Sequence, residues 1–236
     1  MRYLGTMVPL MCFVGVATVA TADPVIDCSH RSLADVVDKV LVQDTVIMFT
    51  GVCNGPIVIG ADGITLQGVS GAHLVSFGGT INSSGNPVAG VSVNSKAGLD
   101  LDAASQLNSF NNGEGVLMQD DSVMTVFNTP QFSGAQGFST INSHNNSRSG
   151  VRVLTGSTLT LVNQARVIST QNRSVGLGAD NGAGLTLVNS TLTANTGSDL
   201  QLTFGTRADL RTLTFGTYTC DATVLVRGTS GIVCPH

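Results

Sequence analysis

The stretch that decides the fold runs from residue 141 to residue 161 and reads INSHNNSRSGVRVLTGSTLTL. It contains three runs in which apolar and polar residues alternate, at residues 141–144, 151–153 and 159–161. Such alternation is typical of a β-strand with one buried face. Asparagine, serine and glycine separate the runs, and these residues favour tight turns. The stretch therefore predicts three short strands joined by turns.

Related runs lie on both sides at spacings of about 25 residues, which makes the stretch one unit of an internal repeat. The first strand of each unit is expected at the apolar anchors Ile81, Leu107, Ile141, Ile168 and Leu192. The second strand is expected at residues 91–93, 116–118, 151–153, 175–177 and 200–202. A third apolar pair follows at Leu99/Leu101, Met124/Val126, Leu159/Leu161, Leu185/Leu187 and Leu210/Leu213.

Strands this short cannot bury an apolar face alone, so the units must stack on one another as successive coils. The sequence therefore predicts an all-β parallel β-helix with continuous apolar columns inside. An asparagine recurs at the end of each first strand, and we expect these residues to sit at a bend in left-handed conformation and to bond their neighbours above and below. The predicted asparagine ladder consists of Asn86, Asn112, Asn146, Asn172 and Asn195.

The repeat, the asparagine turn and the opening section at residues 28–68 together resemble the right-handed parallel β-helix proteins of the pectin-lyase-like superfamily. In that section residues 32–40 have the pattern of an amphipathic helix, with Ser32 as N-cap and Asp35 in the capping-box position. The resemblance implies a helix that closes the start of the coil. It implies one domain over residues 23–236, with an N-terminal cap at 23–53 and a C-terminal cap at 216–236.

The N-terminus has the three regions of a secretory signal peptide over residues 1–22, so we expect a secreted, extracellular or periplasmic protein. Cys12 would be removed with that peptide. The other four cysteines fall in two pairs, Cys28 with Cys53 and Cys220 with Cys234, and proximity favours disulfides within each pair. Zinc binding is the alternative, although neither pair has the spacing of a metal knuckle.

Composition argues against two classes of partner. The formal net charge is −4 and the basic residues are scattered, so we expect no nucleic-acid partner. No apolar run after the signal peptide reaches the ~18 residues of a membrane-spanning helix.

Threonine is frequent in the C-terminal half, but this is ordinary outward-facing β patterning. Binding of ice or another lattice is therefore a minor alternative.

Candidate catalytic residues are few. The pair Asp120/Asp121 and Arg152 are the strongest candidates for a polysaccharide lyase or glycoside hydrolase, and the aspartate pair could also hold calcium. Asp100, Asp102 and His144 resemble in type the residues of polygalacturonases. Their phase in the repeat separates them, since His144 is expected in register with Phe110 and Gln171 and away from both aspartate pairs. No other cofactor is indicated.

Sugar-binding clefts often present aromatic platforms. The chain has no tryptophan and two tyrosines, and its phenylalanines are expected mostly in the core. The exception is residues 128–138, which lengthen one coil and supply Gln131, Phe132 and Phe138 as candidate ligand contacts, because functions are often grafted on such loops. The sequence predicts non-catalytic binding to a surface or polysaccharide. A lyase or hydrolase of the pectin-lyase-like type is the alternative.

Overall fold

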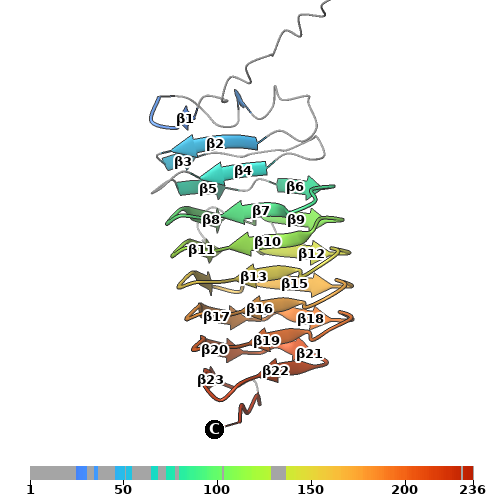
Figure 1. Ribbon diagram of the computed structural model, residues 1–236. Coiled ribbons are helices and arrows are strands. Elements are labelled where there is room, and N and C mark those ends of the chain that lie inside the picture. The colour runs from blue at the N-terminus through green and yellow to red at the C-terminus, as the bar shows by residue number, and fades with distance from the viewer. Residues whose placement is uncertain are drawn as a thin grey trace, which may run out of the picture.

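The computed structural model describes residues 25–30, 35–36, 46–50, 52–54, 65–68, 73–77, 80–102, 104–128, 137–229 and 231–235. The described chain is a parallel β-helix in which each complete coil contributes one strand to each of three parallel sheets, and the first coils contribute described strands to two of them (Figure 1). Sheet A contains, in spatial order, β1 (Ile26–Asp27), β2 (Val46–Thr50), β4 (Thr65–Gly68), β7 (Ala89–Val93), β10 (Glu114–Met118), β13 (Val151–Val153), β16 (Leu177–Ala179), β19 (Leu200–Leu202) and β22 (Tyr218–Cys220).

Sheets B and C form the other two sides of the coil. Sheet B contains β3 (Val52–Asn54), β5 (His73–Phe77), β8 (Gly98–Asp102), β11 (Val123–Val126), β14 (Thr158–Leu161), β17 (Gly184–Val188), β20 (Arg207–Arg211) and β23 (Leu225–Gly228). Sheet C contains β6 (Thr80–Ser84), β9 (Gln106–Phe110), β12 (Thr140–His144), β15 (Arg166–Thr170), β18 (Thr191–Thr193) and β21 (Thr214–Phe215). The chain runs from C to A to B in every complete coil, so the predicted fold class is confirmed.

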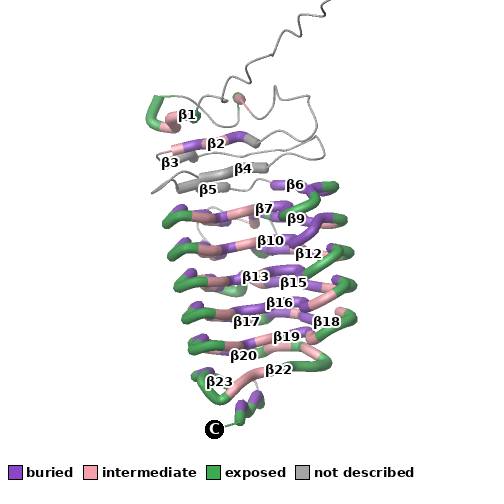
Figure 2. Tube along the Cα trace, in the orientation of Figure 1, coloured by how far each residue is buried: buried purple, intermediate pink, exposed green. Residues whose placement is uncertain are grey.

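The core consists of columns of apolar side chains that repeat from one coil to the next. In sheet A, Val116, Val151, Leu177 and Leu200 follow one another in register and are fully buried. Buried and half-buried residues occupy the strands, and exposed residues gather at the corners of the coil (Figure 2). Identical strand phase on each coil places apolar atoms against apolar atoms, so the stack supplies the burial that single short strands lack.

Three predicted strand phases are wrong by a residue or more. Val167, rather than Ile168, pairs with Ile141 and continues its inward column. The strand of sheet A in that coil is Leu177–Ala179 rather than residues 175–177. On β20, Ala208 precedes Leu210 on the inner face, whereas Leu213 lies beyond the strand. In each case nearby apolar residues permit two phases, and only pairing with the neighbouring coil decides between them.

The five predicted ladder asparagines form one hydrogen-bonded column at the corner between sheets C and A. The backbone amides of Asn86, Asn112, Asn146 and Asn172 each donate to Oδ1 of the next asparagine, at 2.9–3.1 Å. The left-handed residue, however, is the one before each asparagine, namely Gly85, Asn111, Asn145, Gln171 and Ala194. The prediction of left-handed asparagines is therefore wrong. The residue before each asparagine makes the bend. The asparagine side chain accepts a hydrogen bond from a backbone amide of the neighbouring coil.

A second buried column of serines crosses the same corner. The hydroxyls of Ser83, Ser109, Ser143 and Ser169 donate to the carbonyls of Gly90, Gly115, Gly150 and Gly176, at 2.6–2.7 Å. Each serine oxygen also accepts from the side-chain amide of the ladder asparagine three residues later. Serine, asparagine and glycine thus form one polar motif per coil, hydrogen-bonded inside the fold.

Asp199 terminates the ladder. Its Oδ1 accepts from the backbone and side-chain amides of Asn195, and its Oδ2 accepts from the backbone amides of Gly216 and Thr217. Burial by itself raises the pKa of the carboxyl, but these hydrogen bonds outweigh burial and leave the pKa of Asp199 below its ordinary value. A carboxylate can end the column because it accepts on both sides and needs no donor of its own.

The C-terminal end is closed by the last described segment. Residues 231–235 bring Ile232 and Cys234 into buried positions, and the disulfide Cys220–Cys234 joins them to β22. This confirms the predicted disulfide. A solenoid exposes its core where the coils stop, so this segment acts as the cap.

Replacing Cys220 and Cys234 together by serine is expected to lower the free energy of unfolding by about 2–3 kcal/mol, because the crosslink restricts the unfolded chain across a short loop. Urea denaturation followed by circular dichroism measures the change. Thr219→Ser lies on the same strand and keeps a hydroxyl at its position, so it is the control and should leave the midpoint nearly unchanged. An equal loss in both variants would contradict the role of the crosslink.

Much of the predicted N-terminal cap lies outside the described residues, as does the signal peptide at 1–22. Asp35 and Val36 are helical, and Val36 packs against the core, whereas the rest of the helix predicted at 32–40 is not among the described residues. Cys28 is disulfide-bonded. Its predicted pairing with Cys53 stays a prediction, because the side chain of Cys53 is outside the description. Within the described chain, no helix is long and apolar enough to cross a membrane.

Candidate functional site

The outer face of sheet C carries a row of asparagine side chains. Asn82, Asn108 and Asn142 occupy the same position on β6, β9 and β12, where strand alternation points them away from the core. Nδ2 of Asn108 donates to Oδ1 of Asn82 at 2.8 Å, and Nδ2 of Asn142 donates to Oδ1 of Asn108 at 2.9 Å. These bonds hold the amides in one orientation across three coils.

Two flat side chains stack beside this row. Phe110 and His144 pair in register on β9 and β12, and their ring centroids lie 5.4 Å apart with an angle of 7° between the planes. Nδ1 of His144 lies 3.1 Å from Nδ2 of Asn145. An amide nitrogen is a donor, so Nδ1 of His144 can accept from Asn145. The pair offers a continuous aromatic edge beside the asparagine row.

A guanidinium lies further along the same face. Nε of Arg166, at the start of β15, donates to Oγ1 of Thr140 at 3.2 Å. The guanidinium carbon lies 5.6 Å from the centre of the Phe138 ring, and Phe138 is 39% exposed. Cation–π attraction and the hydrogen bond together fix the guanidinium over the ring. We call Asn82, Asn108, Asn142, Phe110, His144, Phe138 and Arg166 the sheet C strip.

A hollow of about 300 Å³ adjoins the strip at the corner where the asparagine ladder turns. Asn111 and Asn145, which directly follow Phe110 and His144, line it together with Gly113 and Arg173. The left-handed conformation of both asparagines turns the chain sharply, and Gly113 allows the backbone of residues 87 and 88 to approach closely. The strip and the hollow form one polar surface with arginines at both of its sides.

The predicted catalytic pair lies elsewhere. Asp120 and Asp121 form the exposed turn between sheets A and B, both with φ of 59°. The backbone amide of Lys96 donates to the carbonyl of Asp120 at 2.9 Å, as expected for the turn shared with residues 95 and 96. No group of three or more histidine, cysteine, aspartate or glutamate side chains that could hold a metal occurs in the described part of the chain. Calcium at this pair stays a prediction.

The other predicted residues come from different parts of the coil. Arg152 lies in the middle of β13 in sheet A, in register with Leu117 and Gly178. Residues 128–138 connect β11 to β12, so they follow the end of β11 that is distant from Asp121, about 13 Å along the strand. Gln131 and Phe132 lie outside the described residues. Phe138 is described, and it belongs to the sheet C strip.

The separation of His144 from the aspartates agrees with its predicted phase. Asp100 and Asp102 are on β8 in sheet B, whereas His144 is on β12 in sheet C. Register with Phe110 is as predicted, but the partner on the other side is Thr170 and not Gln171. The reason is the phase error at Val167, which shifts every residue of β15 by one position.

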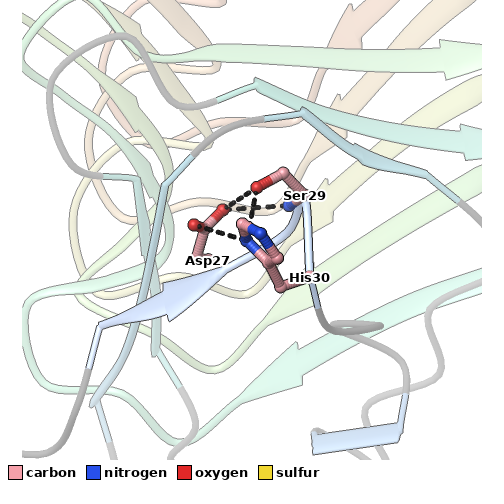
Figure 3. A network of polar contacts seen from close by, with 3 residues as sticks. All are labelled: Asp27, Ser29 and His30. Atoms are coloured by element: carbon pink, nitrogen blue, oxygen red, sulfur yellow. Dashed lines mark hydrogen bonds and ion pairs between the residues drawn. The ribbon is translucent and has the colours of Figure 1, made fainter.

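Asp27, Ser29 and His30 form a polar cluster near the start of the described chain (Figure 3). Nδ1 of His30 lies 2.8 Å from the Ser29 hydroxyl and 2.9 Å from Oδ2 of Asp27. A catalytic triad uses opposite nitrogens of the ring for these two partners, so this geometry cannot relay a proton from serine to aspartate. Hydrogen bonds from the Ser29 hydroxyl and amide, then from His30, lower the pKa of Asp27 to about 2.

Sequence reasoning missed most of the sheet C strip, because it assigned the phenylalanines mainly to the core. Phe110 is only half-buried and faces outward, and Phe204 is 64% exposed. The signal was present in the alternation of residues 141–144, where Ile141 and Ser143 face inward and Asn142 and His144 face outward.

Comparison of the chain with protein-family models, with curated proteins and with solved structures found no match.

Proposed function

We propose that this protein binds a polysaccharide, or a surface coated with one, along the sheet C strip and without catalysis. The observation that carries the proposal is the continuity of the strip over β6, β9, β12 and β15: a row of amides, a stacked aromatic pair and an arginine in fixed positions. Amide groups can donate to and accept from sugar hydroxyls. Aromatic rings pack against the apolar faces of sugar rings, and the guanidinium offers further directed donors.

Absence of catalysis is part of the proposal. Glycoside hydrolysis uses a pair of carboxyl groups that flank the scissile bond. Among the described residues, the outward positions of β6, β9, β12, β15, β18 and β21 carry no aspartate or glutamate. His144 and Arg166 can orient a ligand there, but neither lies beside a carboxylate on these strands that could serve as the second group.

The proposal also includes export of the protein by a signal peptide and descent from the pectin-lyase-like superfamily. A signal peptide at residues 1–22 would deliver the domain outside the cytoplasm, where polysaccharide surfaces are found. The coil of three parallel sheets with an asparagine ladder supports descent from the pectin-lyase-like superfamily, whose members include binders as well as enzymes.

Binding tests the proposal directly. Residues 23–236 are titrated with a panel of soluble polysaccharides by affinity electrophoresis, and the best ligand is then measured by calorimetry. Phe110→Ala and His144→Ala are each expected to weaken binding about tenfold, because each removes half of the stacked platform. Phe204→Ala, which removes an exposed phenylalanine at another corner, is the control and should bind as the natural chain does.

The enzyme alternative is measured on the same samples by unsaturated-product absorbance and reducing ends. Turnover that disappears in the double variant Asp120→Ala/Asp121→Ala would replace the binding function with a catalytic one. Binding that is equal in Phe110→Ala, His144→Ala and the control would place the ligand on a different surface.

A further inference from the structure

Charge is unevenly distributed along the chain, and the segment that holds most of the sheet C strip has only positive groups. Residues 122–179 contain no aspartate or glutamate, and they contain four arginines: Arg148, Arg152, Arg166 and Arg173. Arg166 begins β15 of sheet C, and Arg152 lies on β13 of sheet A. Arg148 and Arg173 follow β12 and β15, at the corner between these two sheets. The sign of this segment is thus opposite to the formal net charge of −4.

The described carboxylates nearest to this corner in the chain are buried and hydrogen-bonded. Glu114 is 6% exposed, and its Oε2 accepts from the backbone amide of Ser149 at 2.9 Å. Asp199 is 4% exposed and accepts four hydrogen bonds at the end of the ladder. Within the described chain, neither Arg148 nor Arg173 makes an ion pair. The corner between sheets C and A therefore carries exposed positive charge.

The hollow at this corner collects hydrogen-bond donors from three successive coils. Asn111 follows β9, Ser147 follows β12 and Arg173 follows β15, and all three line the hollow. These residues are exposed, and their side chains make no hydrogen bond to any other residue that the structure describes. Asn145 also lines the hollow, and it has a second N–H besides the one toward Nδ1 of His144. No carboxylate is among the described residues that line the hollow.

We propose that the hollow binds a sulfate or phosphate ester group carried by the polysaccharide. This inference rests on the proposed function, because the sheet C strip would hold the sugar rings beside the hollow. An ester group of this kind presents three terminal oxygens, which can accept from donors on three coils, whereas a carboxylate presents two. The guanidinium of Arg173 supplies the opposite charge and paired N–H donors.

The position and size of the hollow agree with this role. Asn111 and Asn145 directly follow Phe110 and His144, so a sugar ring packed against the aromatic pair can direct a substituent into the hollow. The volume of about 300 Å³ is at the lower limit for ligand sites, which suits one charged group rather than a sugar chain.

Polymers with one common backbone test the inference. Dextran, dextran sulfate, dextran phosphate and carboxymethyl dextran, matched in length and substitution, are titrated into residues 23–236 by calorimetry at one ionic strength. At least one of the two esters is expected to bind about tenfold more tightly than the carboxymethyl polymer, and the tighter ester identifies the group. Equal affinity for carboxymethyl dextran and both esters, or for neutral dextran and both esters, would overturn the inference.

Variants separate the hollow from general charge attraction. Arg173→Gln is expected to weaken binding of the tighter ester about tenfold, and Ser147→Ala about threefold, because each removes a donor to the ester oxygens. Arg207→Gln removes the same charge from an exposed position on sheet B and is the matched control. An equal loss in Arg173→Gln and Arg207→Gln would overturn the inference, because affinity would then follow net charge alone.

Inorganic sulfate and phosphate test the hollow without the strip. In nuclear magnetic resonance spectra, the backbone amides of Asn111, Gly113 and Ser147 are expected to shift with at least one of these anions in the natural chain and in Phe110→Ala, but not in Arg173→Gln. These shifts, together with unchanged polymer binding by Phe110→Ala, would contradict the proposed function and keep the hollow as an anion site. No shift with either anion would overturn the inference, and weaker polymer binding by Phe110→Ala would then still support the proposed function.

Discussion

Asp199→Ala is expected to lower the free energy of unfolding by about 4 kcal/mol. The carboxylate accepts four hydrogen bonds at the end of the asparagine ladder, from Asn195 on one side and from Gly216 and Thr217 on the other. Alanine leaves these donors without their acceptor in a site where Asp199 is only 4% exposed. Each lost bond to a charged group is worth about 1–2 kcal/mol, and the terminal coil depends on all four.

The same carboxylate makes the end of the coil sensitive to acid. The folded-state pKa of Asp199 is below its ordinary value of 3.8, so protons bind more readily to the unfolded chain than to the folded one. Its contribution is therefore fully present above pH 3.8 and is lost as the pH falls through the lower folded-state pKa. In Asp199→Ala this part of the pH dependence should be missing.

Urea denaturation at pH 7 and at a series of acidic pH values measures both effects. Asp180→Ala is the matched control, because the Asp180 carboxylate accepts from the adjacent backbone amide in an exposed turn. We expect the control to lose less than about 0.5 kcal/mol. An Asp199→Ala chain that is as stable as the control at pH 7 would show that the ladder needs no terminal acceptor.

The repeat made the fold predictable from the sequence. Alternating short runs about 25 residues apart have few stable solutions other than stacked coils, and the recurrence of asparagine at one phase of the repeat located the ladder corner. The predicted phase failed at Val167, Ala208 and Leu177, where other apolar residues lie close in the chain. In those coils only the register with the next strand decides which side chain faces inward.

The candidate site was less predictable because it depends on neighbouring coils and not on any local motif. Phe110 and His144 are 34 residues apart in the chain and meet only because β9 and β12 pair in register. Arg166 joins Phe138 in the same way, after the long connection between β11 and β12. Reading outward positions down each column, rather than searching for acidic pairs, would have brought these residues together.

Gly150→Ala is expected to lower the free energy of unfolding by about 3–5 kcal/mol, although it adds a single methyl group. An ideal Cβ on Gly150 would overlap Oγ of Ser169 and would lie 2.6 Å from both Nδ2 of Asn172 and the carbonyl oxygen of Gly176. These atoms belong to the buried polar motif of the next coil, so they cannot move without breaking its hydrogen bonds. Overpacking and the lost bonds both contribute to the expected loss.

Gly178→Ala separates this steric effect from the general effect of replacing glycine in a strand. An ideal Cβ on Gly178 meets its nearest atoms at 3.7 and 4.0 Å, which is ordinary contact, and alanine also restricts the unfolded chain more than glycine does. The control should therefore be neutral or slightly stabilising in urea denaturation. Similar midpoints for Gly150→Ala and Gly178→Ala would mean that the serine and asparagine column can shift as a unit. The recurrence of glycine in the polar motif, at Gly90, Gly115, Gly150 and Gly176, would then reflect turn formation rather than close contact between successive coils.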